Sequence, residues 1–84
     1  MRTHDLKILP SYFDQVANGN KPFEIRKNDR DFKVNDVLLL REIEPTRSVH
    51  EPIKYTDRMV AAKVTYITDF EQKPDYVVMG ISLI

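Results

Sequence analysis

The sequence predicts a small, mainly β fold with one or two short helices, curled into a closed or partly closed barrel. Segments with strand character outnumber helical ones by about five to one or two. They are short and separated by polar turns, a spacing typical of small barrels. Apolar residues make up 42% of the 84 residues, enough for a packed core, and the length suits a single domain spanning residues 1–84.

The amino-terminal part of the chain predicts a strand followed by a short helix. Residues 3–9 carry Leu6, Ile8 and Leu9 and read as a strand, which Pro10 ends. Gly19 is expected to close the helix, since glycine accepts the left-handed conformation that follows many helix ends. The helix itself, of about eight residues, is indicated by apolar positions that recur on one face: Tyr12, Phe13, Val16 and Ala17.

The next segments predict two further strands. Residues 23–26, Phe-Glu-Ile-Arg, alternate strictly, so the two apolar side chains point to one face and the two charged side chains to the other. A polar loop at 28–31 and an Asn-Asp turn at 35–36 follow. Residues 37–40 form a continuous apolar run, which suggests a central strand covered on both faces.

The carboxyl-terminal half predicts two more strands. Residues 44–57 are polar, contain two prolines and suggest a long exposed loop. Residues 59–67 are rich in valine, threonine and tyrosine and read as a long strand. After a polar loop at 69–75, the strand at 76–83 closes the chain, with Gly80 as a bulge or a point of close approach.

Composition excludes several classes of function. Thirteen basic and thirteen acidic side chains cancel, so any nucleic-acid contact must rest on a local basic face. No cysteine is present, and His4 and His50 lie far apart, so we expect neither a metal site nor a cofactor. No apolar run is long enough to cross a bilayer and the first residues lack a signal sequence, so we expect a cytoplasmic protein without membrane contact.

The chemistry of the chain is concentrated in residues 19–26. Gly19 permits a sharp turn, and Lys21 just after it suits a phosphate or a carbonyl oxygen. Glu24 and Arg26 share one face of a strand about 7 Å apart, where a carboxylate can accept from a base amine and a guanidinium can clamp a phosphate. The alternative is that Glu24 and Arg26 form an ion pair that orders the rim of the barrel, with Lys21 in solvent. The positive charge continues downstream at Lys27 and Arg30.

The spacing of these four residues resembles the Gly-x-Lys-x-x-Glu-x-Arg signature of the ASCH family (activating signal cointegrator homology), a branch of the PUA-like barrels. Residues 4–8, 23–32 and 76–81 are also similar to a small bacterial and phage subgroup of that family. The resemblance implies a five- or six-stranded barrel with one or two helices. It also implies a cleft for RNA or a nucleotide-like ligand, contacted by Lys21, Glu24 and Arg26 with help from Lys27 and Arg30.

Two other functions stay open. Some small relatives in the resembled family are amidohydrolases acting on acylated cytidine with a lysine, a threonine nucleophile and a glutamate. Here Lys21 is retained and Glu24 replaces the threonine, so only a lysine–glutamate pair that positions water would remain. The exposed 44–57 loop is a candidate protein contact. Three tyrosines could stack on bases, although Tyr66 could equally pack in the core: Tyr55, Tyr66 and Tyr76.

Overall fold

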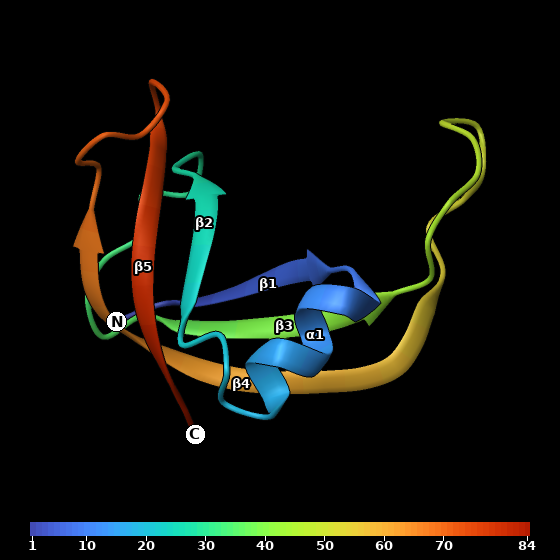
Figure 1. The fold of residues 1–84 in the computed structure, drawn as a ribbon, viewed down its shortest axis with the longest axis horizontal. Coiled ribbons are helices and arrows are strands. Elements are labelled where there is room, and N and C mark those ends of the chain that lie inside the picture. The colour runs from blue at the N-terminus through green and yellow to red at the C-terminus, as the bar shows by residue number, and fades with distance from the viewer.

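Five strands form one curled sheet in the order β1-β3-β4-β5-β2, with a single helix against it (Figure 1). The computed structural model describes all residues from Met1 to Ile84. Strand β1 pairs with β3 in parallel, and every other pairing is antiparallel. The expected mainly β fold with few helices is therefore confirmed. The elements are β1 (Thr3–Ile8), α1 (Pro10–Ala17), β2 (Phe23–Lys27), β3 (Val37–Ile43), β4 (Tyr55–Thr68) and β5 (Tyr76–Leu83).

Strand β4 gives the sheet its curl. It is 14 residues long, and its first part pairs with β3 while its last part pairs with β5. The register shifts between Val64 and Tyr66, opposite Gly80, as in a β-bulge. A Cβ at Gly80 would lie 3.0 Å from the Thr65 hydroxyl oxygen, so the expected close approach at this glycine is confirmed. In Figure 1, β4 bends upward at this end and carries β5 and β2 across the other strands.

The barrel is only partly closed, because β1 and β2, the two edge strands of the sheet, do not pair with each other. Arginine side chains bridge the gap instead. Arg26 Nη2 donates to the carbonyl oxygen of Lys7 at 2.8 Å, and Arg30 Nη1 donates to that of Asp5 at 2.8 Å. These guanidinium groups satisfy carbonyls that an edge strand would otherwise expose.

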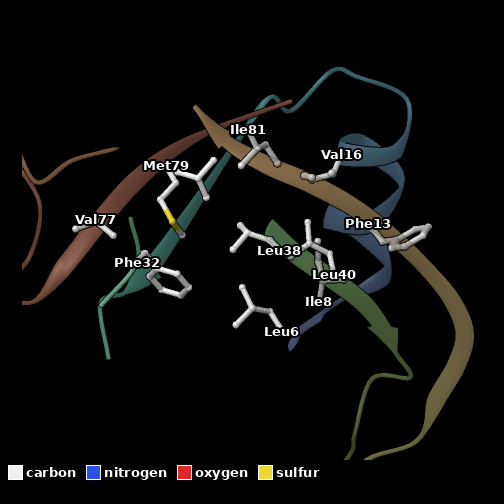
Figure 2. Close-up of a cluster of buried hydrophobic side chains, with 12 residues drawn as sticks. Leu6, Ile8, Phe13, Val16, Phe32, Leu38, Leu40, Val77, Met79 and Ile81 are labelled. Carbon is white, nitrogen blue, oxygen red and sulfur yellow. The ribbon is translucent and has the colours of Figure 1, made fainter. Parts of the chain in front are cut away.

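The hydrophobic core lies between the concave face of the sheet and α1. Leu38, Leu40, Val64 and Met79 are fully buried on the inner face. Figure 2 shows Leu38, Leu40 and Met79 among the core side chains that converge between the strands. Helix α1 contributes Phe13 and Val16. An eight-residue helix is not stable in isolation, so this packing holds it in place.

Several boundaries and orientations differ from the expectations. Strand β4 begins at Tyr55, so the exposed connection is shorter than 44–57, because Tyr55 pairs with Ile43 of β3 beyond a register shift. The expected cover on both faces of 37–40 is wrong: alternate residues of β3 are fully buried and the others half-buried. Tyr12 is exposed rather than part of the core. The one helix, α1, has eight residues, and no helix of the structure is long and apolar enough to cross a membrane.

Candidate functional site

A cleft of about 350 Å³ opens where the end of β1, the first turn of α1 and strand β2 meet. It lies beside the gap between the two edge strands, so it occupies the place where the barrel fails to close. Half of its lining is apolar or aromatic: Ile8, Leu9, Tyr12 and Ile25. The other half is charged: Lys7, Lys21, Glu24 and Arg26.

Glu24 is the centre of the charged wall. Its side chain is almost fully buried, with 4% exposed, and each carboxylate oxygen accepts from a different cation. Lys21 Nζ lies 2.7 Å from Oε1, and Arg26 Nε lies 2.9 Å from Oε2. Lys21 and Arg26 keep 19% and 25% of their side-chain surface in contact with solvent. The buried carboxylate is therefore neutralised, and the cations that hold it still reach the cleft.

Local structure brings these three side chains together. Helix α1 ends at Ala17, and Gly19 follows with φ of +85°, the left-handed conformation expected there. The N–H of Lys21 then donates to the carbonyl of Gln15 at 3.0 Å, which ties the turn to the helix. Lys21 thereby reaches the side of β2 that carries Glu24.

Strand β2 is turned with its charged face inward. Glu24 pairs in register with the buried Met79, and Arg26 with Val77, so both charged residues point to the inner side of the sheet. The apolar residues of the same strand, Phe23 and Ile25, are 38% and 51% exposed. An edge strand beside an open cleft can carry charges on its inner face because solvent and paired counter-charges are within reach.

The lining combines positive charge with aromatic surface. Its three cations, Lys7, Lys21 and Arg26, outnumber the single carboxylate. Lys21 Nζ also lies 5.2 Å from the ring centre of Tyr12 and 5.1 Å from that of Phe23, both within cation–π range. The cleft therefore favours an anionic ligand that also offers a flat or apolar part.

The structure brings together three of the predicted ligand residues and leaves two outside. The ion-pair alternative is also present, because Glu24 does pair with Arg26, but Lys21 joins the pair instead of standing in solvent. Lys27 and Arg30 do not line the cleft. Lys27 follows the outward alternation of β2, and the guanidinium of Arg30 serves the β1 edge.

Sequence reasoning missed the part of the lining that comes from β1 and α1. The sequence pattern places Lys7 and Leu9 only within a strand, and Tyr12 only on the apolar face of a helix. One signal was available for Tyr12, since a large aromatic residue in the first turn of a very short helix is easily left uncovered. No signal in the sequence indicated that the end of β1 would face β2.

Two further buried carboxylates serve the fold rather than the cleft. Asp36 bonds His4 Nε2 at 2.8 Å and accepts from the backbone N–H groups of Arg2 and Lys33. The hydrogen bond with His4 is the main cause that lowers the pKa of Asp36 to about 2, while burial opposes it. His4 is therefore structural, and His50 is exposed in the loop before β4.

Glu42, on β3 opposite Ile8, forms the second network, which reaches α1 at Asp14. Arg58 donates to both of its carboxylate oxygens at 2.7 and 2.8 Å and to Asp14 at 2.8 Å. Hydrogen bonds from Arg58 and then Thr56 lower the pKa of Glu42 to about 2, and the same contact raises the pKa of Arg58. No group of three or more histidine or carboxylate side chains is arranged to hold a metal ion.

The fold and the site define a small curled-sheet protein with a cationic, aromatic-lined cleft at the open side of the barrel. The chain belongs to the family described as "Domain of unknown function (DUF3850)", whose model matches residues 3–81. It is also 35% identical over 81 residues to a protein of Escherichia phage P2 described as "Uncharacterized 12.9 kDa protein in GpA 3'region". The match covers 93% of this chain and 66% of the phage protein, so the chain spans slightly less than two thirds of that relative.

Proposed function

We propose that this protein is a small RNA- or nucleotide-binding module of the ASCH type within the PUA-like barrels, and that its ligand occupies the cleft beside residues 19–26. The observation that carries the proposal is the cleft wall, where Lys21 and Arg26 neutralise one buried carboxylate and a third cation, Lys7, lines the same cleft with an exposed tyrosine. A volume of about 350 Å³ is at the small end of ligand pockets and suits a single nucleotide better than a folded RNA.

The role of each lining residue in ligand binding follows from which of its polar groups are not already hydrogen-bonded within the protein. Both oxygens of Glu24 are engaged, so its role is to hold Lys21 and Arg26 in position rather than to read a base. The ammonium of Lys7 and the remaining N–H groups of Arg26 face a phosphate, for which a guanidinium offers paired donors. The ring of Tyr12, 52% exposed, provides a surface on which a base stacks.

The proposal is tested by titrating the ¹⁵N-labelled protein with each of the four ribonucleoside monophosphates and following the amide resonances. We expect one or more of them to shift the amides of Ile8, Leu9 and Ile25, with binding weakened about tenfold or more by Tyr12→Ala. Lys33→Ala is the matched control, because Lys33 is 66% exposed and lies outside the cleft. Shifts that scatter over the surface, or that persist unchanged in Tyr12→Ala, would exclude the cleft as the binding site.

The amidohydrolase alternative has one observation in its favour, the 2.7 Å contact between Lys21 and Glu24. Against it, Tyr12 carries the only hydroxyl among the lining residues, and Glu24 would have to leave a cation before it could accept a proton from water. Incubation with N4-acetylcytidine, followed by chromatography of the nucleoside, separates the two functions. Release of cytidine that Lys21→Met abolishes would favour the hydrolase.

A further inference from the structure

The outer face of β2, β5 and the end of β4 carries an aromatic surface that meets the cleft only along β2, where Ile25 lines both and Phe23 contacts Lys21. Register places Phe23 and Tyr66 on either side of Gly80, and Ile25 and Thr68 on either side of Val78. Since neighbouring strands lie about 4.8 Å apart, Phe23 and Tyr66 are separated by about 10 Å across a position that has no side chain. Tyr66 is 65% exposed, which excludes the alternative that it packs in the core.

Lysines mark both ends of this surface. Lys27 is opposite Tyr76 at one end of β5, and Lys63 is opposite Ser82 at the other. Tyr76 and Ser82 are six residues apart along β5, so the two lysines lie at positions about 20 Å apart along the strand direction. No outward position of these strand segments is a carboxylate, whereas the flanking loop 69–75 carries three acids, Asp69, Glu71 and Asp75, and one lysine, Lys73. We call this face, made of Phe23, Ile25, Lys27, Lys63, Tyr66, Thr68, Tyr76, Val78 and Gly80, the outer platform.

We infer that the outer platform is a second binding surface, which takes single-stranded nucleic acid by stacking bases on its tyrosines while its lysines contact the backbone. Exposed aromatic rings on a sheet, with cations placed along the path of the backbone, are an arrangement by which sheets bind single strands. The inference goes beyond the proposed function, because it concerns a different face of the molecule and a polymer rather than a nucleotide in a cleft.

Charge favours a nucleic acid over a second copy of the chain as the occupant. If two copies of the chain paired through this face, their lysines would come together, because the strand positions carry lysines and no carboxylate that could form an ion pair with them. A polyanion with flat bases complements both features. Lys21 already lies 5.1 Å from the ring centre of Phe23, and Tyr76 is only 37% exposed, so Tyr66, which is 65% exposed, is the main stacking position.

Fluorescence anisotropy with fluorescein-labelled octauridylate and octathymidylate tests the platform. We expect both single strands to bind, Tyr66→Ala to weaken binding about tenfold, and Tyr66→Phe to stay within about twofold of wild type, because stacking needs the ring and not the hydroxyl. Lys63→Ala should lower the slope of log K against log salt by about 0.7. Tyr55→Ala and Lys54→Ala are the controls and should bind as wild type does. The ring of Tyr55 packs on Arg41 at the opposite end of β4 from the platform, and Lys54 is exposed just before that strand.

Three results would overturn the inference: no binding of either octanucleotide, equal binding by Tyr66→Ala and wild type, or equal losses in Tyr66→Ala and Tyr55→Ala. A dimer in sedimentation equilibrium that Tyr66→Ala dissociates, without octanucleotide binding, would assign the face to a second copy. The cleft is tested separately by Tyr12→Ala. Octanucleotide binding that depends on Tyr66, with no nucleotide bound in the cleft, would refute the proposed function and leave the outer platform in place.

Discussion

The double variant Lys21→Met/Arg26→Met should destabilise the protein strongly, because it leaves a buried carboxylate without a counter-charge. Glu24 is 3% exposed, and its two oxygens accept from those two side chains alone. Breaking a buried ion pair from one side typically costs about 3–5 kcal/mol. A domain of 84 residues is expected to have a total free energy of unfolding of roughly 4–13 kcal/mol, so this loss is a large part of the whole.

Adding Glu24→Met to the double variant should restore most of that stability. The triple variant replaces the whole ionic group by apolar side chains of similar size, an exchange that is often neutral in buried sites. We expect the free energy of unfolding of the triple variant to stay about 1 kcal/mol below that of wild type, because Arg26 also donates to the carbonyl of Lys7 across the gap between β1 and β2. The triple variant is therefore the suitable control for ligand binding, because it removes the charges of Lys21, Glu24 and Arg26 and stays folded. In the double variant, a loss of binding could not be separated from a loss of folded protein.

Urea unfolding followed by circular dichroism measures these differences. With a slope of about 1–1.5 kcal/mol per molar urea, a loss of about 3–5 kcal/mol should make the double variant unfold at a concentration about 2–5 M lower than wild type. Lys33→Met is the control, since its ion pair with Asp31 is exposed on both sides and should change stability by less than about 1 kcal/mol. A triple variant no more stable than the double, or a double variant within about 1 kcal/mol of wild type, would refute the role assigned to Glu24.

Three further predictions concern the fold. The pKa of Asp36 is lowered from its ordinary 3.8 to about 2. Its contribution to the free energy of unfolding is therefore complete above about pH 5 and is lost as the pH falls through 4 towards 2. In Asp36→Asn, the free energy of unfolding from urea titrations should depend less on pH over that range. Gly19→Ala should cost about 1–2 kcal/mol in urea unfolding, because φ is +85° there although nothing lies within 4 Å of an added Cβ. Gly80→Ala should cost about 1–3 kcal/mol through contact with the Thr65 hydroxyl, and the double change Gly80→Ala/Thr65→Ala should recover part of it.

Much of the fold was predictable because its signals are local. Pro10 and Gly19 bound the helix as expected, and the strands after the polar turns appear where alternation or apolar runs predicted them. The predicted strand boundaries were wrong where pairing extended a strand into polar sequence, as in β4, which begins at Tyr55 and not at residue 59. A polar residue that pairs with a neighbouring strand looks like a loop residue until the partner is known.

The ionic centre of the site was predictable for the same reason, and the rest of the site was not. Lys21, Glu24 and Arg26 lie within six residues, so one helix end and one strand suffice to bring them together. Lys7 and Tyr12 reach the same cleft only because the sheet curls until β1 faces β2. That curl depends on the length of β4 and on the bulge opposite Gly80.

The amino-acid sequence alone determined where the helix stops, that the residues of β2 alternate between charged and apolar, and that a lysine follows the glycine turn. Only the tertiary structure decided which face of β2 points inward. The charged face does so because β2 is an edge strand at the unclosed side of the barrel, where a paired carboxylate remains close to solvent. The same choice leaves the apolar side chains of β2 outside, next to the tyrosines of β4 and β5.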